Sequence, residues 1–138
     1  MNIYTSYYGN RSLNPQKHFL VQVSNSAPSG INAEYKFQEV IPDWNRIVEP
    51  YKKGELDAIA YQHLYNGQLD ARRFQILLRL DDIREKAAGR DIVLLCYEKP
   101  GAFCHRRILA NWLERNAPLL NQETLQVQEL GTGQLSLF

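Results

Sequence analysis

The segment that most constrains the fold of this chain is a continuous apolar run at residues 92–96 (IVLLC). A strand with one solvated face alternates apolar and polar residues, whereas an uninterrupted run is typical of a parallel strand covered on both faces. The run is far shorter than the roughly 20 apolar residues needed to cross a bilayer. It therefore predicts a central strand in an α/β domain, whose mostly parallel sheet is flanked by helices.

Other segments have the alternation or the composition of strands. Residues 3–8 and 18–24 lie before the apolar run, and residues 124–130 lie after it. A shorter extended segment is expected at residues 35–40. Strands with helical segments between them favour the α/β class over an all-β or all-α fold.

Three amphipathic stretches before the apolar run predict helices. The first begins at Pro42 and ends at Gly54, and the second covers residues 57–65 and ends near Gly67. The third runs from Asp70, as its N-cap, to about residue 88. We expect this third helix to be mostly covered, because its apolar stripe is too wide for a solvent-facing helix. The stripe consists of Phe74, Ile76, Leu77, Leu78, Leu80 and Ile83.

Length and charge exclude several classes of protein. The 138 residues are enough for one domain, which we place at residues 1–130, followed by a tail at residues 131–138. The net charge of +1 does not favour binding to DNA or membranes through bulk positive charge. The N-terminus lacks a basic segment followed by a long apolar one, so we expect a cytoplasmic protein without a signal peptide.

The chain has two cysteines, Cys96 and Cys104, which cannot make a disulfide framework. Cys96 continues the apolar run, as a small core residue does. No spacing of Cys and His matches a zinc signature. Neither cysteine begins a Cys-x5-Arg phosphatase loop, because Ala102 and Ala110 stand where the arginine would be. The sequence therefore predicts no metal and no cofactor.

The residues that follow the apolar run predict a ligand site. Ligands of open α/β sheets bind beyond the carboxyl ends of strands, where helices begin. Cys104, His105 and Arg106 stand at such a helix start, and Glu98 follows the strand. A thiolate there is stabilised by the helix dipole, and a histidine can act as a general base. We predict Cys104, His105 and Glu98 as catalytic residues; the alternative is that Cys104 only packs at the helix start.

The first strand carries hydroxyl groups toward the same edge if it runs parallel to residues 92–96. Tyr4 and Ser6 share one of its faces, and Tyr7 lies on the other. A buried tyrosine hydroxyl needs a partner, so several tyrosines are unusual in a plain core strand. We predict that Tyr4, Ser6, Tyr7 and Arg106 bind an anionic or polar ligand, with Tyr4 and Ser6 closing the pocket. The alternative is that the tyrosines are half-buried at a sheet edge.

The run RDIVLLCYEKPGAFCHRRILANWL resembles the signature of the DUF488 family, a domain of unknown function with a Leu-Leu-Cys-x-Glu strand followed by Cys-His-Arg. The segments IYTSYYGN, IPDWNRIVEPYKKGELD and AYQHLYNGQL agree with the same family. The resemblance covers most of residues 2–115, although residues 12–32 depart from it. It implies a compact α/β fold with a polar pocket and a link to nucleic-acid metabolism, but no reaction. The motif positions are taken by Tyr4, Ser6, Glu98, Cys104, His105 and Arg106.

The last five residues closely resemble the pentapeptide by which bacterial proteins dock on the DNA sliding clamp. They are Gln134, Leu135, Ser136, Leu137 and Phe138. The glutamine supplies amide hydrogen bonds, the apolar residues fill a pocket on the clamp, and residues 131–133 (GTG) provide a flexible tether. The resemblance implies a bacterial or phage protein. The alternative is a tail that packs on its own domain.

Two functional hypotheses follow. In the first, the chain is an accessory protein of DNA replication or repair that the clamp recruits, and its pocket binds a nucleotide, a base or a nucleic-acid end. In the second, it is a small cytosolic enzyme that acts on a nucleotide or another anionic metabolite through Cys104, His105 and Glu98. The two are compatible, because recruitment raises the local concentration of DNA around the domain.

Overall fold

The computed structural model describes residues 2–97, 103–117 and 125–131. Five strands form one sheet in the order β3-β2-β4-β1-β5, and every pair of neighbours is parallel. The strands are β1 (Ile3–Tyr7), β2 (His18–Gln22), β3 (Tyr35–Lys36), β4 (Asp91–Cys96) and β5 (Val127–Glu129). The predicted single α/β domain with a parallel sheet is confirmed, and the apolar run forms the central strand.

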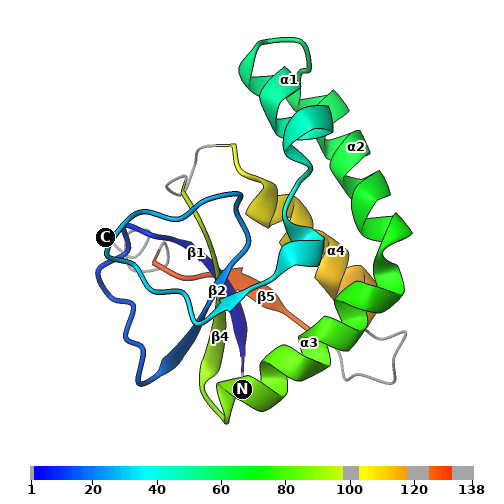
Figure 1. Ribbon diagram of the computed structural model, residues 1–138. Helices are drawn as coiled ribbons and strands as arrows, with labels where there is room; N and C mark the ends of the chain where they lie inside the picture. Colours follow the sequence, from blue (N-terminus) through cyan, green and yellow to red (C-terminus); the bar gives the residue numbers. More distant parts are fainter. Residues whose placement is uncertain (1, 98–102, 118–124, 132–138) are drawn as a thin grey trace, which may run out of the picture.

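The two faces of the sheet are covered in different ways (Figure 1). Three helices pack on one face, around a core that includes Ile92, Leu94 and Cys96. The other face carries Val93 and Leu95, and the loops that follow β1 and β2 cover it. The helices are α2 (Ala58–Ala71), α3 (Arg73–Ala87) and α4 (His105–Asn116). The central strand is thus covered on both faces, as its apolar run predicts, but by loops on one of them.

The segment between β3 and α2 consists of three short helical turns. They are the 3-10 turn η1 (Gln38–Val40), the π-helical turn η2 (Trp44–Val48) and α1 (Glu49–Lys52). Asp43 caps the second turn, because its side chain accepts a hydrogen bond from the backbone N–H of Asn45. The chain leaves α1 through Gly54, whose φ of +78° suits glycine. This segment carries Trp44 and Tyr51 to the carboxyl edge of the sheet.

The boundary between α2 and α3 lies later than the sequence predicts. The second helix was expected to end near Gly67, but α2 continues to Ala71. The amide of Gln68 binds the backbone on both sides of Pro42, donating to the carbonyl of Ile41 and accepting from the N–H of Asp43. Asp70 does not cap α3; its carboxylate accepts from the indole N–H of Trp112 in α4. These long-range hydrogen bonds override a local glycine signal.

The stripe expected to cover α3 is only partly buried. Ile76, Leu80 and Ile83 are buried in the core, but Phe74 is 73% exposed and Leu78 is 66% exposed. Phe74 and Leu78 are four residues apart, so they share a face of the helix that points to solvent. The expectation of a mostly covered helix is therefore wrong for this pair. None of the described helices is both long enough and apolar enough to cross a membrane.

Candidate functional site at the carboxyl edge of the sheet

A cavity of about 160 Å³ opens at the carboxyl edge of the sheet, where β2 and β4 end and α4 begins. The loop after β2, the η2–α1 segment and one residue of α2 all contribute to its lining. The described lining residues are Ser24, Asn25, Ser26, Pro42, Trp44, Val48, Tyr51, Lys52, Tyr61, Tyr97, Phe103, Cys104 and His105. The predicted site residues Cys104 and His105 therefore lie at a real cavity, in the position expected for an open α/β sheet.

Aromatic side chains surround the cavity, and three of them are exposed. Trp44 is 42% exposed, Tyr97 is 46% exposed and Phe103 is 38% exposed. The ring of Phe103 also contacts Tyr51 and Tyr61 deeper in the cavity, with centroids 5.1 and 5.0 Å apart. Several large, solvent-exposed aromatic side chains around one cavity are typical of a binding site. The sequence does not predict this feature, because these residues come from separate segments of the chain.

Lys52 places a positive charge beside these rings. The ammonium group of Lys52 lies 5.5 Å from the centroid of the Trp44 ring, within the range of a cation–π contact. Lys52 is itself exposed and lines the cavity. A ligand that stacks on Trp44 would therefore find a positive charge at the mouth of the cavity.

His105 is buried and held in one orientation. Its pKa is lowered to about 4, mainly by burial; the hydrogen bond to Val23 raises the pKa and the nearby charge of Arg106 lowers it, each by less than burial does. The ring is therefore neutral at pH 7. Since the carbonyl of Val23 can only accept, Nε2–H of His105 donates to it. The lone pair of Nδ1 then faces Cys104, whose Sγ is 3.9 Å away.

Cys104 is the N-cap of α4 and is joined as a disulfide to Cys96, the last residue of β4. Cys96 is fully buried, as expected of a core residue, but its sulfur also belongs to the site. The sequence prediction treated Cys96 only as a core residue. The signal for its place at the site was available, since Cys96 ends the central strand and Cys104 stands where the next helix begins. Among the described residues, donor atoms of Cys96, Cys104 and His105 all lie within 4.8 Å of one another, so these three are a candidate set of metal ligands when the disulfide is reduced.

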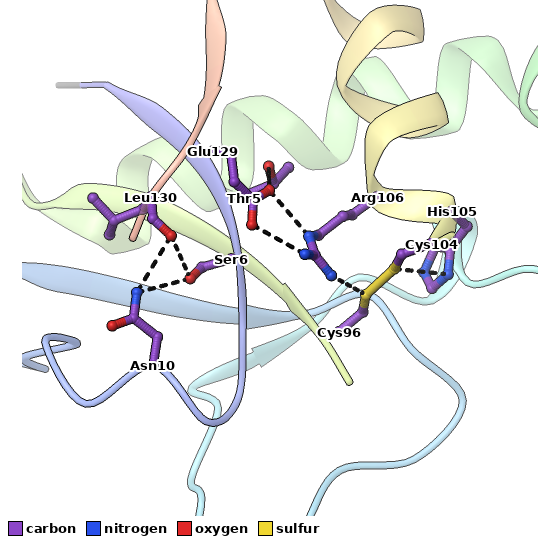
Figure 2. A network of polar contacts seen from close by, with 9 residues as sticks. All are labelled: Thr5, Ser6, Asn10, Cys96, Cys104, His105, Arg106, Glu129 and Leu130. Carbon is purple, nitrogen blue, oxygen red and sulfur yellow. Dashed lines mark hydrogen bonds and ion pairs between the residues drawn. A yellow bond between two sulfur atoms is a disulfide. The ribbon is translucent and has the colours of Figure 1, made fainter. Parts of the chain in front are cut away.

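Arg106 lies behind the cysteines and does not line the cavity in the part of the chain that the structure describes. Arg106 is 1% exposed, and its guanidinium makes two hydrogen bonds of 3.0 Å to the Glu129 carboxylate (Figure 2). A third bond of 3.0 Å runs from Nη1 to the sulfur of Cys96. The hydroxyl of Thr5 donates to the same carboxylate at 2.7 Å. The structure thus places Arg106 in a buried ion pair with Glu129 of β5. The same guanidinium contacts the sulfur of Cys96, so the ion pair helps to hold this cysteine in place.

The predicted ligand residues of β1 divide between the two faces of the sheet. Tyr4 packs with Val93 and Leu95 on the face that loops cover. Ser6 lies on the same face, donating to the Leu130 carbonyl at 2.9 Å and accepting from the Asn10 amide at 3.0 Å. Figure 2 shows this second network apart from that of Arg106. Neither Tyr4 nor Ser6 lines the cavity as described, because the alternation of a strand turns them away from Cys104.

Tyr7 points to the other face, at the end of β1. It stands opposite Cys96 in the parallel register and is half-buried. It is not among the described lining residues of the cavity. The prediction that β1 and β4 end at the same edge is nevertheless correct, since the two strands are parallel neighbours.

Two further sets of predicted residues lie outside the described residues. Glu98 belongs to the loop between β4 and α4. The pentapeptide at residues 134–138 follows Gly131, the last residue described. Their predicted roles therefore rest on the sequence.

Comparison with known families supports the resemblance noted in the sequence. The model of DUF488-N3a, described as the active DUF488-N3 subclade, matches residues 3–117. The chain belongs to the DUF488-N3a family. The match extends from β1 through α4, so it includes the Cys-His-Arg segment and ends before Glu129 and the tail. No curated protein and no solved structure matches the chain.

Proposed function

We propose that this DUF488-N3a protein is an enzyme that binds a nucleotide or a base in the cavity and acts on it next to Cys104 and His105. The observation that carries the proposal is the group of exposed rings of Trp44, Tyr97 and Phe103 around the buried His105 and Cys104. Bases stack on aromatic side chains, and every base offers a face for stacking. The description of the family as an active subclade supports catalysis.

The size and charge of the cavity favour a base with an anionic extension. Its volume of about 160 Å³ is close to the roughly 150 Å³ of an apolar cavity that holds one benzene molecule. A single ring system therefore fits inside, while a ribose and a phosphate would remain at the mouth. Lys52 is at the mouth and supplies a positive charge for the phosphate.

Cys104 and His105 provide the reactive groups in this proposal. The sulfur of Cys104 lies at the N-terminus of α4, and the neutral Nδ1 of His105 faces it, so that the ring can accept the proton of the thiol once the disulfide is reduced. A thiol reductant must first open the disulfide to Cys96, because the thiol of Cys104 is otherwise consumed. Glu98 remains a proposed third catalytic residue on the basis of the sequence alone.

Binding tests the proposal directly. We expect the reduced chain to bind nucleoside monophosphates in a calorimetric titration, and Trp44→Ala to weaken that binding. Loss of one base–aromatic stack costs about 1–3 kcal/mol, which corresponds to a roughly 5- to 150-fold increase in Kd. Lys52→Ala should weaken binding of a monophosphate more than binding of the matching nucleoside.

A matched control is available on α3. Phe74 is more exposed than Trp44 and does not line the cavity as described, so Phe74→Ala removes an aromatic ring from another surface. Its Kd should equal that of the unmodified chain. If Trp44→Ala and Phe74→Ala bind the four nucleoside monophosphates with the same affinity as the unmodified chain, the cavity is not their binding site.

A second function is proposed for the tail, on the basis of its sequence. The pentapeptide from Gln134 to Phe138 has the form of a bacterial clamp-binding peptide, and we propose that it recruits the domain to the DNA sliding clamp. Recruitment would bring the cavity to DNA although the net charge of +1 gives little attraction of its own. The domain would then serve as an accessory protein of DNA replication or repair.

Titration against a bacterial sliding clamp tests the recruitment. Replacing Leu137 and Phe138 with alanine should weaken binding by about two orders of magnitude or more, since each buried side chain contributes roughly 1.5–3 kcal/mol. Gln134→Ala should have a smaller effect. The melting temperature should not change in any of these variants. Equal clamp affinity with and without residues 134–138 would contradict the proposal, as would a large drop in melting temperature on truncation.

A further inference from the structure

Three soft or borderline donor atoms converge beside the cavity, and two of them belong to residues that line it. They are the sulfurs of Cys96 and Cys104 and Nδ1 of His105. Cys96 ends β4, and Cys104 and His105 lie at the start of α4. All three residues are buried. Two thiolates and an imidazole are a donor set that suits Zn²⁺ and similar ions.

The backbone spacing of the two cysteines leaves room for an ion between their sulfurs. Their Cα atoms are 7.6 Å apart, whereas disulfide-bonded cysteines usually have Cα atoms about 4.4–6.8 Å apart. Opening the disulfide lets each side chain relax toward its own element without moving β4 or α4. The two sulfurs can then chelate one ion.

The orientation of His105 is that of a metal ligand. A ligating histidine almost always donates its other ring N–H to a carboxylate, a carbonyl or water, which fixes the tautomer. Here Nε2–H donates to the carbonyl of Val23, so that Nδ1 presents its lone pair toward Cys104 at 3.9 Å. The ring would not need to turn in order to bind an ion.

From these observations we propose that reduced Cys96, Cys104 and His105 bind one Zn²⁺-like ion, with a fourth coordination position open to the cavity. The open position follows from the lining of the cavity, which includes both Cys104 and His105. Three protein ligands with one open position are the arrangement of a catalytic zinc site rather than a structural one. Nucleotide binding by the aromatic rings needs no metal, whereas in the metal-bound state Cys104 and His105 act as ligands and the group at the open coordination position takes over as the reactive one.

The charges around the site balance when the ion is bound. Two thiolates and one divalent ion sum to zero, as a buried site requires. The Arg106 guanidinium donates to the sulfur of Cys96 at 3.0 Å, and Glu129 neutralises its charge from the other side. Hydrogen bonds of this kind to a metal ligand are the outer-shell contacts that orient and tune it.

Formation of the site from the disulfide requires a reductant. A dithiol supplies two electrons and two protons to the disulfide of Cys96 and Cys104, and is itself oxidised to a disulfide. The ion then displaces the proton of each thiol, so two protons are released as it binds. The oxidised chain therefore serves as a control that cannot use its sulfurs as thiolate ligands.

Cobalt(II) is the probe for the test. The full chain is reduced with a dithiol, freed of reductant without air, and titrated with Co²⁺ while its absorption is recorded. We expect one Co²⁺ per chain, with thiolate-to-cobalt charge-transfer bands and the visible bands of a tetrahedral site. Zn²⁺ should abolish these bands, because it binds such sites more tightly than Co²⁺. The oxidised chain should show neither band.

Single substitutions assign the ligands. Cys96→Ser and Cys104→Ser should each weaken the charge-transfer bands and the binding of Co²⁺, because only one thiolate ligand remains. His105→Ala should weaken Co²⁺ binding by at least the roughly 10- to 100-fold that loss of an outer-shell partner causes. His63→Ala, which removes an exposed histidine on α2, should leave both bands and affinity unchanged. Circular dichroism confirms that each variant is folded.

The proposal is overturned if the reduced, folded chain gains no charge-transfer band, or if the band keeps its full intensity in Cys96→Ser and in Cys104→Ser. This outcome is separate from a failure of nucleotide binding, which depends on Trp44 and is measured without metal. A chain that binds nucleotides but no Co²⁺ would keep the proposed function and lose the metal site.

Discussion

The two faces of β1 make different kinds of polar contact: one contacts a buried ion pair, and the other makes neutral hydrogen bonds. The residues of the two faces nevertheless alternate along the same strand. On the face covered by helices, Thr5 contacts the buried Arg106–Glu129 ion pair behind the cysteines. On the face covered by loops, Ser6 takes part in neutral hydrogen bonds with Asn10 and Leu130. Neighbouring positions of one motif can therefore serve different purposes. A match to a family signature does not by itself place a residue at the site.

The largest effect is expected from removal of the charge of Glu129. Breaking a buried ion pair by neutralising one partner typically costs about 3–5 kcal/mol, and the side chains of Arg106 and Glu129 are 2% and 8% exposed. Glu129→Gln should therefore lower the free energy of unfolding by about that amount in urea denaturation.

The matched control is Glu39→Gln. Glu39 pairs with Arg79 across 3.0 Å, but the Arg79 side chain is 52% exposed. Surface pairs contribute about 0.2–1 kcal/mol. If both variants lose the same free energy of unfolding, the helix-covered face does not bury a special ion pair.

A smaller effect is expected from the hydroxyl of Thr5. Thr5→Val keeps the shape of the side chain and removes the 2.7 Å hydrogen bond to the Glu129 carboxylate. Hydrogen bonds to charged groups contribute about 1.5–3 kcal/mol. Thermal and urea unfolding should show a loss in this range. A loss of zero would mean that the Glu129 carboxylate is fully satisfied without Thr5.

The hydroxyl on the opposite face should matter less. Ser6→Ala removes a 2.9 Å hydrogen bond to the Leu130 carbonyl, which still accepts from the Asn10 amide at 3.3 Å. A neutral hydrogen bond contributes about 0.5–1.5 kcal/mol. Nucleotide affinity should not change, because Ser6 lies on the far side of the sheet. If Ser6→Ala changed the nucleotide affinity but not the stability, Ser6 would have to be part of the binding site.

The smallest effect concerns a partly exposed carboxylate on α3, that of Asp82. The hydrogen bond from Lys86 lowers the pKa of Asp82 below its usual 3.8, and the hydroxyl of Tyr35 lowers it further. This contribution to stability is fully present above pH 3.8 and is lost as the pH falls through the lowered pKa. The free energy of unfolding should be measured at pH 6 and at pH 3. Between these two values it should fall slightly less for Asp82→Asn than for the unmodified chain. If Asp82→Asn lowered the free energy of unfolding at pH 6 by more than Ser6→Ala does, the contrast between buried and partly exposed groups would be contradicted.

The sequence predicts most of the fold because its strongest signals are local. The apolar run at residues 92–96 is enough to identify a central parallel strand, and the helix start after it predicts Cys104 and His105 at the edge of the sheet. The end of α2 is not predictable in this way, since Gln68 and Asp70 are held by distant partners.

The part of the site that the sequence could not predict depends on long-range pairing. Glu129 reaches Arg106 only because β5 adds to the sheet beside β1. The exposed aromatic residues around the cavity come together from η2, the end of β4 and the start of α4. Tyr4 and Ser6 were predicted on the correct edge of the sheet, but periodicity could not show which face the helices cover.

The central claim is that ligands bind on the helix-covered face, at the carboxyl edge of the sheet. It is tested most directly by a two-dimensional amide NMR titration of the reduced chain with adenosine and guanosine monophosphates. The account predicts that the amide signals of Ser26, Tyr97 and Cys104 shift in proportion to occupancy, while those of Ser6 and Asn10 remain in place. Shifts centred on Ser6 and Asn10, or no saturable shift at Tyr97 and Cys104, would contradict it.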